Sequence, residues 1–187
     1  RDDYADVRQR TVAQSSVLNK NLSPLFNNLV EFNPETPDFS DLRCDLCTSW
    51  ELAADGVTYT FHINPDANWW DGVPVTADDV VFSIDAQIDP DKFEILKGRS
   101  TSATVNTSLY VESGTSRAID DKTVEITTKF TAGAFLTAIA NETASIQAKH
   151  IVIGKGIQQG GKDLDAIVGS GPFKFVDYVK EVSVEYE

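Results

Sequence analysis

The sequence predicts an α/β fold, in which a mixed sheet is flanked by helices. Residues 57–63 alternate apolar and polar side chains, and this period of two is typical of a half-buried strand. Residues 76–88 begin with a threonine followed three residues later by an aspartate, and then continue as an apolar stripe. This pattern indicates a capped amphipathic helix. A further strand signal at residues 123–128 places strands on both sides of that helix in the chain.

The remaining elements follow from local signals along the chain. Asp55 and Gly56 supply a turn before the first strand, and Pro90 ends the main helix after Asp89 because the residue before a proline disfavours helix. The other expected segments are, in order, a weak helix at 6–19, an apolar segment at 24–30, a loop at 33–37, a helical turn at 93–97, a loop at 98–106, a strand at 108–112, a charged turn at 120–121, helices at 132–140 and 143–151, a flexible connection at 154–161 and a strand at 182–186.

Composition and charge restrict the class of protein. The chain has 187 residues, of which 41% are hydrophobic and 24% charged, as expected of one globular domain or one and a fraction. The net charge of −13 argues against a nucleic-acid partner and against adsorption to anionic lipid, since both need a basic surface. No apolar run approaches the roughly 18 residues that span a bilayer. We interpret the acidity as a solvated surface; a preference for cationic ligands is the alternative.

One run joins a hairpin, a double tryptophan turn and a capped helix without a spacer. Its ordered motifs are Ser49-Trp50-Glu51, Asp55-Gly56, Thr58-Tyr59-Thr60-Phe61, Trp69, Asp71-Gly72, Pro74-Val75-Thr76-Ala77 and Asp79-Val80. This order and spacing resemble the signature of the family 5 solute-binding proteins, the peptide, dipeptide and nickel binders of ABC importers. Further matches at 25–30, 119–126 and 168–173 extend the resemblance over residues 15–187.

The resemblance implies two α/β lobes around a cleft, of which this chain is expected to be an amino-terminal fragment ending inside the first lobe. Arg1 opens the chain without a signal peptide, as expected of a mature or excised piece. The implied function is to capture peptides or a related small solute outside the cytoplasm, free in a periplasm or lipid-anchored, and to deliver it to ABC permease subunits. A monomer without enzymatic activity or cofactor is expected. The family's range of solutes leaves the ligand open.

The resemblance also implies a division of the chain. Residues 1–40 would be the amino-terminal piece of the first lobe, residues 41–168 an inserted α/β domain, and residues 169–187 the return strand into the lobe. Gly169, Gly171 and Pro172 fit such a crossing, because glycine permits a sharp change of direction and proline fixes the next step. A plain turn inside one domain is the alternative.

Cys44 and Cys47 form a CxxC pair with no second pair to complete a zinc site. Cys47 stands where the family has a small residue, so the pair inherits no role from the resemblance. A structural disulfide is predicted if the segment turns enough to bring the two Cα atoms within roughly 7 Å. Two free buried thiols, or a redox or metal-handling module, remain the alternatives.

The other candidate motifs do not indicate a nucleotide-binding, metal-binding or catalytic site. Gly156 to Lys162 matches most of a phosphate-binding loop, but Asp163 stands where a hydroxyl would be needed for magnesium. His62 and His150 are the only histidines, too few for a metal cluster. The pairs Asp78-Asp79 and Asp120-Asp121 lie at a helix start and a turn, where carboxylates bond backbone N–H groups. No catalytic residue and no metal site are predicted.

Ligand contacts can be carried over from the family at four positions. The loop before the helix that ends near Phe26 lines the cleft in oligopeptide binders, which points to Gln14, Ser15 and Ser16. The stretch after Pro90 approaches the ligand in some members, which points to Phe93. The alternative for all four is an ordinary surface or helix position.

Three tryptophans complete the list of candidates. Trp50 and Trp69 match the family and are expected to pack the hairpin under the helix, although stacking on a ligand is an alternative. Trp70 occupies a position that the family usually fills with a polar residue, and is therefore expected to be partly exposed. A large exposed apolar patch around Trp70 would favour a different function, that of a non-catalytic interaction domain.

Overall fold

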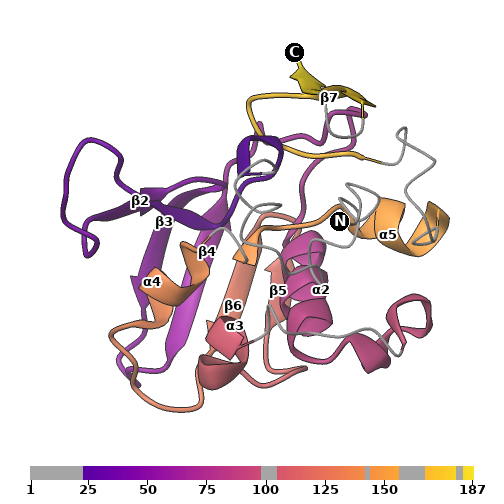
Figure 1. The fold of residues 1–187 in the computed structure, drawn as a ribbon. Coiled ribbons are helices and arrows are strands. Elements are labelled where there is room, and N and C mark those ends of the chain that lie inside the picture. Colours follow the sequence, from indigo (N-terminus) through magenta and orange to yellow (C-terminus); the bar gives the residue numbers. More distant parts are fainter. Residues whose placement is uncertain (1–22, 98–104, 142–143, 156–166, 180–182) are drawn as a thin grey trace.

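Four antiparallel strands form the central sheet of the computed structural model, which describes residues 23–97, 105–141, 144–155, 167–179 and 183–187. Their order across the sheet is β3-β4-β6-β5 (Figure 1). The strands are β3 (Cys47–Leu52), β4 (Thr58–Ile63), β5 (Arg117–Asp120) and β6 (Thr123–Thr127). The predicted fold class, a sheet with flanking helices, is confirmed.

The register of β4 against β6 explains why one face of the sheet is buried. Tyr59 lies opposite Ile126 and Phe61 opposite Val124, and all four side chains belong to the main hydrophobic core. The residues between them, such as Thr60, remain partly exposed on the other face. One packed and one solvated face is the usual arrangement of an antiparallel sheet, and it accounts for the alternation in the sequence.

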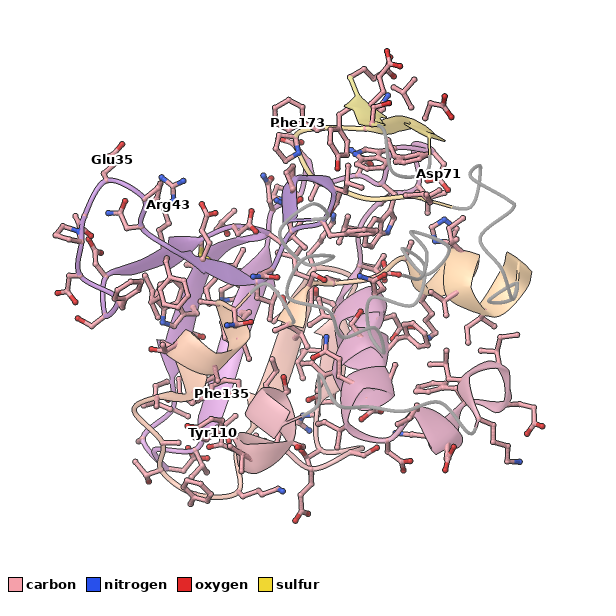
Figure 2. The ribbon with its side chains drawn as sticks, in the orientation of Figure 1. Glu35, Arg43, Asp71, Tyr110, Phe135 and Phe173 are labelled. Atoms are coloured by element: carbon pink, nitrogen blue, oxygen red, sulfur yellow. A yellow bond between two sulfur atoms is a disulfide. The ribbon has the colours of Figure 1, made fainter. Side chains whose placement is uncertain are left out.

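Three helices lie over the packed face (Figure 1): α2 (Ala77–Ile88), α3 (Val105–Tyr110) and α4 (Phe135–Ile139). The ring of Phe135 lies 4.9 Å from that of Tyr59, which joins α4 to β4. Tyr110 and Phe135 point toward one another, with ring centres 6.3 Å apart (Figure 2). Aromatic contacts therefore join α3, α4 and the sheet into one core.

Two hairpins and several short helices complete the described structure. The hairpins pair β1 (Val30–Phe32) with β2 (Leu42–Cys44), and β7 (Phe175–Val179) with β8 (Ser183–Tyr186). The short helices are η2 (Ser23–Leu25), η3 (Pro90–Lys92), η4 (Glu94–Leu96) and α5 (Lys149–Lys155). Within the described residues, no helix is both long and apolar enough to cross a membrane.

The prediction of a strand at residues 108–112 is wrong. The loop predicted at 98–106 also extends too far, because a helix begins at Val105. Residues 105–110 form α3 instead, and Val111 contributes a single bridge to Thr128. The positions that turn inward are Thr107, Tyr110 and Val111, a spacing that suits a helix and not a strand. Tertiary packing against α4 therefore decides the local conformation. The sequence analysis also missed β5, just before the predicted charged turn.

The helix expected at residues 143–151 begins only at Lys149. The preceding residues bond to distant parts of the chain: the Ile146 N–H donates to the Asn27 carbonyl at 2.9 Å, and the Gln147 N–H to Ser83 Oγ at 2.8 Å. Backbone donors used in this way are not available for a helix. The helix expected at 132–140 is likewise shorter, while the weak helix at 6–19 lies outside the described residues.

Candidate functional site

A groove of about 490 Å³ opens where the amino-terminal segment, the β1–β2 hairpin and the end of α4 meet. Both polar and apolar side chains line it. The residues that line it are Pro24, Phe26, Asn27, Asn28, Glu31, Phe32, Asp45, Ala140, Asn141 and Pro172. Sites for small ligands are typically concave and combine apolar walls with a few convergent polar groups, so this groove is the candidate site.

Asp45 is the partly buried carboxylate of this groove. Its Oδ1 accepts a hydrogen bond from Asn27 Nδ2 at 2.6 Å, and its Oδ2 accepts one from the backbone N–H of Asn28 at 2.7 Å. Burial raises the pKa of this carboxyl to about 6, against the lowering effect of the two hydrogen bonds. Glu31 raises this pKa further and Arg43 lowers it, both by smaller amounts. The groove thus holds a carboxyl group that can change its charge near neutral pH.

Asn28 also anchors the segment that follows α4. The residue is 8% exposed, and its Nδ2 donates to the carbonyl oxygens of Ala140 at 3.1 Å and Asn141 at 3.2 Å. The neighbouring Asn27 accepts at its Oδ1 a hydrogen bond from Ser170 Oγ at 2.9 Å. Neighbouring asparagines therefore tie together three segments that lie far apart in the sequence.

A disulfide joins Cys44 and Cys47, with the two Cα atoms 5.0 Å apart. The turn that it closes carries Asp45, whose N–H donates to the Leu29 carbonyl at 3.1 Å, and the N–H of Cys47 donates to the same oxygen at 3.3 Å. The disulfide and these backbone bonds hold the turn against β1. Asp45 is therefore presented to the groove from a constrained loop.

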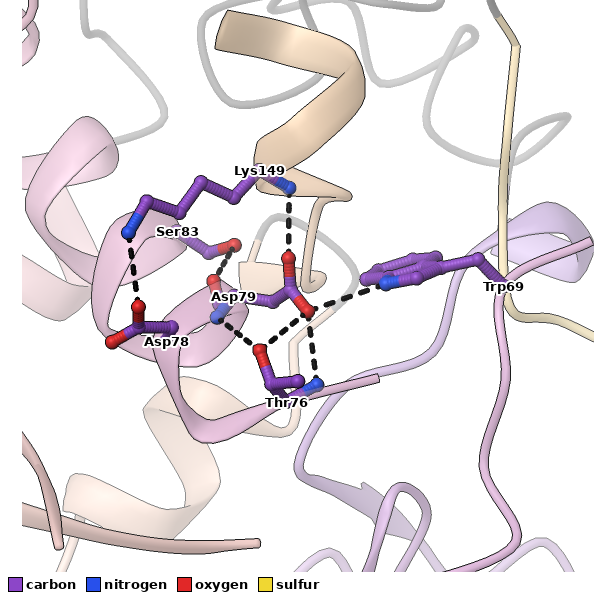
Figure 3. Close-up of polar contacts among 6 residues, drawn as sticks. All are labelled: Trp69, Thr76, Asp78, Asp79, Ser83 and Lys149. Atoms are coloured by element: carbon purple, nitrogen blue, oxygen red, sulfur yellow. Dashed lines mark hydrogen bonds and ion pairs between the residues drawn. The ribbon is translucent and has the colours of Figure 1, made fainter. Parts of the chain in front are cut away.

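The predicted N-cap of α2 at Thr76 is confirmed (Figure 3). The carboxylate of Asp79, which completes this cap, also accepts hydrogen bonds from residues outside the helix. Asp79 Oδ2 accepts from the N–H of Thr76 at 2.9 Å and from Trp69 Nε1 at 3.3 Å, and its Oδ1 accepts from the N–H of Lys149 at 2.9 Å. Trp69 is 2% exposed, so it packs as expected. Asp78 instead forms an exposed ion pair with the Lys149 ammonium at 3.2 Å. This cluster joins α2 to α5 and the tryptophan turn.

Trp70 is half-buried, and so is Trp50. The indole N–H of Trp70 donates to the Gly171 carbonyl at 3.0 Å, and its ring lies 6.4 Å from that of Phe26. A Cβ on Gly169 would come within 1.9 Å of the Leu25 carbonyl oxygen and 2.7 Å of the Trp70 ring. These contacts give the glycines a role in close packing, in addition to the change of direction expected from the sequence.

Of the four predicted ligand contacts, Phe93 is the one that the described residues include. Gln14, Ser15 and Ser16 lie outside the described residues. Phe93 does not line the groove; its ring meets that of Phe82 edge-on at 4.9 Å, in a cluster with Leu96.

Sequence reasoning missed the groove residues of the described chain. The adjacent amides Asn27 and Asn28, in an otherwise apolar stretch, were a usable signal. Nothing local marked Asn141 or Asp45 as their neighbours.

The described residues bring together no group of three or more histidine, cysteine or acidic side chains that could hold a metal ion. The two histidines form separate contacts with carboxylates. His150 Nε2 lies 2.8 Å from Asp71 Oδ2, and His62 Nε2 lies 3.7 Å from Glu51 Oε1. The segment from Gly156 to Lys162, similar to a phosphate-binding loop, lies outside the described residues.

Comparison with known proteins places this chain in one class, the bacterial extracellular solute-binding proteins. The model of the middle region of family 5 of these proteins matches residues 41–187. The chain therefore belongs to the family 5 bacterial extracellular solute-binding proteins.

Two curated relatives are similar over most of the chain. The heme-binding protein A of Haemophilus influenzae is 30% identical over 185 residues, covering 94% of this chain and 33% of the relative. The dipeptide-binding protein of Escherichia coli is 31% identical over 175 residues, covering 88% and 32%. The chain spans about a third of the length of these relatives.

Solved structures share the fold. A solute-binding protein from A. tumefaciens R10 in complex with mannopinic acid has a TM-score of 0.76 at 29% identity, covering 95% of this chain and 33% of that one. A Campylobacter jejuni protein in complex with nickel and L-histidine has a TM-score of 0.70 at 27% identity, covering 95% and 32%. Proteins of this fold are thus bound to chemically different ligands in these structures.

Proposed function

We propose that this chain is part of the solute-binding component of an ABC importer, which captures peptides or a related small solute outside the cytoplasm and delivers it to membrane permease subunits. The observation that carries the proposal is the groove that Asn28, Asp45 and Asn141 line beside aromatic side chains. Amide and carboxylate groups beside apolar walls suit the backbone and side chains of a short peptide. The dipeptide-binding relative supports this choice of solute class.

The proposed division of the chain has support in the contacts between its two ends. The Gly171 N–H donates to the Leu25 carbonyl at 3.0 Å, and the Phe173 N–H to the Pro24 carbonyl at 3.3 Å. Residues 1–40 and 169–187 are proposed to form one lobe, with residues 41–168 as the inserted domain that contains the four-stranded sheet. Binding would then proceed by closure of this lobe and a second lobe around the solute.

The proposal includes the ligand contacts of the first lobe, the oligomeric state and the location of the protein. Gln14, Ser15, Ser16 and Phe93 are retained as proposed ligand contacts from the first lobe. The protein is proposed to act as a monomer without catalysis, free in a periplasm or lipid-anchored on the outer face of the cytoplasmic membrane. Most ligand contacts, including those of the second lobe, are proposed to come from sequence beyond residue 187.

The test is calorimetric titration of the natural protein that contains this chain, unfolded and refolded to remove bound solute. The panel holds dipeptides, tripeptides, heme, mannopinic acid and nickel–histidine. We expect at least one peptide to bind with a Kd of about 1 µM or tighter. A saturating peptide should also raise the unfolding temperature, since ligands stabilise the state they bind.

Two comparisons make this experiment specific. Asn141→Ala should weaken peptide binding. Glu35→Gln should leave it unchanged, because Glu35 is exposed on the β1–β2 loop (Figure 2) and does not line the groove. The 187-residue chain alone should bind the same peptide far more weakly, because half of the cleft is missing. Tight binding of heme or mannopinic acid with no peptide binding would reject the peptide class. Failure of every solute would favour an interaction domain.

A further inference from the structure

The ionisable side chains that line the groove in the described structure are all acidic. They are Glu31 and Asp45, and the other polar lining side chains are the amides of Asn27, Asn28 and Asn141. No lysine, arginine or histidine of the described chain lines the groove. An anionic group entering here would meet two carboxylates and lose its hydration without a cationic partner, which is unfavourable.

The two carboxylates differ in how their charge is balanced. Glu31 is paired with Arg43 at 2.6 Å on the exposed surface of the hairpin, where such a pair contributes little. Asp45 is bonded by neutral donors, the Asn27 amide and the Asn28 N–H, and forms no ion pair within the described part of the chain. Its charge is therefore the one that a ligand could neutralise.

Asp45 also keeps hydrogen-bonding capacity for a ligand. A carboxylate offers about four acceptor sites. Within the described residues, Asp45 uses two of them, one on each oxygen. A ligand donor could occupy the remaining sites without displacing Asn27 or Asn28, and a charged donor would gain most because its hydrogen bonds to carboxylates are the stronger kind.

The apolar wall of the groove suits a particular kind of cation. Phe26 and Phe32 line the groove beside the polar residues, and Phe26 belongs to a buried cluster. Aliphatic stems of lysine and arginine side chains pack on such surfaces while the charged end reaches a polar partner, and aromatic faces attract the charge itself. A bare divalent ion would instead need several oxygen ligands in one shell.

We infer that this groove takes a cationic group of the solute, an ammonium or guanidinium on an aliphatic stem, with Asp45 as its charge partner. The inference rests on the proposed function and names the class of solute that the same site prefers. It predicts that, of two peptides equal in shape, the protein binds the cationic one more tightly.

The test compares two tripeptides, Ala-Lys-Ala and Ala-norleucine-Ala, whose central side chains differ in the ammonium group. Each is titrated calorimetrically into the natural protein that contains this chain. We expect the lysine peptide to bind about tenfold more tightly, as hydrogen bonds to a buried charge allow. Asp45→Asn should reduce that preference to less than about threefold, while the control Glu35→Gln should leave it unchanged.

A measurement on the unaltered protein covers the case in which Asp45→Asn does not fold. Asp45 takes up a proton as the pH falls, and the charged groups that act on it are Glu31 and Arg43. The preference for lysine should therefore weaken at pH 5 relative to pH 7.5, while norleucine binding stays constant. Glu31→Gln should weaken the preference less than Asp45→Asn does.

The outcomes separate the inference from the proposed function. Equal binding of the two peptides would overturn the inference and leave the peptide-binding function standing. A lysine preference that persists in Asp45→Asn and at pH 5 would overturn the role of Asp45. If neither peptide binds while the calorimetric panel yields only a ligand that is not a peptide, both the peptide class and this inference are rejected.

Discussion

Trp70 donates its indole N–H to the carbonyl oxygen of Gly171, which lies 101 residues further along the chain, at 3.0 Å. The backbone N–H of Trp70 donates to the Gly169 carbonyl at the same distance. Gly171 in turn donates its own N–H to Leu25. Three segments far apart in the sequence are thereby fixed at one point, beside the groove residue Pro172.

Gly169→Ala should destabilise the fold at this crossing. The new Cβ would lie 1.9 Å from the Leu25 carbonyl oxygen, and the backbone would have to move to relieve the clash. Overpacking of this kind costs about 1–3 kcal/mol, and contact with backbone places the expected loss near 3 kcal/mol. Urea unfolding followed by tryptophan fluorescence measures it. Gly133→Ala is the control, because no atom lies within 4 Å of its added Cβ. Equal losses in both variants would contradict the packing argument.

Asp79→Ala should destabilise the start of α2. Asp79 is 4% exposed, and its carboxylate accepts hydrogen bonds from Thr76, Trp69 and Lys149 (Figure 3). Removing it leaves buried donors without a partner, at an expected cost of about 3 kcal/mol. Asp78→Ala is the matched control, because its exposed ion pair with Lys149 is worth less than about 1 kcal/mol. Thermal and urea unfolding of both variants provide the comparison. A similar loss in the two would show that the buried hydrogen bonds do not carry the effect.

Local sequence patterns were sufficient to predict those elements in which the pattern matches the packing of the folded protein. The alternation that ends at Ile63 predicts β4, and the cap at Thr76 predicts α2, because in both cases the pattern and the packing coincide. The prediction for the segment that contains Tyr110 was wrong because the local pattern there does not decide the conformation. Its short apolar run suits a strand or a helix, and contact with Phe135 on α4 decides between them.

The groove could not be predicted from the sequence. The hydrogen bond from Asn28 to Ala140 joins residues 112 positions apart, and no local pattern encodes such a contact. The CxxC spacing predicted the disulfide that the structure contains, but not that its turn carries Asp45 into the groove. Long-range contacts of polar residues follow from the folded arrangement, whereas periodicity reports only which face of an element is buried.

Removal of the disulfide should have a modest effect on stability. Cys44 and Cys47 are separated by three positions, so the closed loop is short and the entropy lost by the unfolded chain is small. The chain-entropy relation gives about 2 kcal/mol for a loop of this length. The double variant Cys44→Ser and Cys47→Ser, compared by urea unfolding with the oxidised protein, measures this difference.

The same cysteines provide a test of the redox alternative. A structural disulfide should give no reaction with a thiol reagent in the folded protein until a reductant is added. After the disulfide is reduced, the two thiols should show no reversible electron-transfer activity. Rapid reaction with mild dithiols, at rates typical of a redox-active CxxC pair, would instead support the redox module.

Asp45 should make the stability of the protein fall as the pH rises toward neutrality. Burial raises the pKa of this carboxyl from 3.8 to about 6, so the folded state binds the proton more tightly than the unfolded state does. The resulting stabilisation is fully present below about pH 4 and is lost as the pH rises through about 6, with a total near 3 kcal/mol.

The difference in unfolding free energy between the natural protein and Asp45→Asn isolates this effect, because other titrating groups cancel. That difference should change by about 2.4 kcal/mol between pH 4 and pH 7, in the direction that favours the natural protein at low pH. Carbon-13 NMR of the Asp45 carboxyl should give a midpoint near 6, the value set by burial. A midpoint near 4 would mean that the hydrogen bonds from Asn27 and Asn28 outweigh burial. In that case Asp45 would be mostly charged from pH 5 to pH 7.5, and the lysine preference would change little over that range.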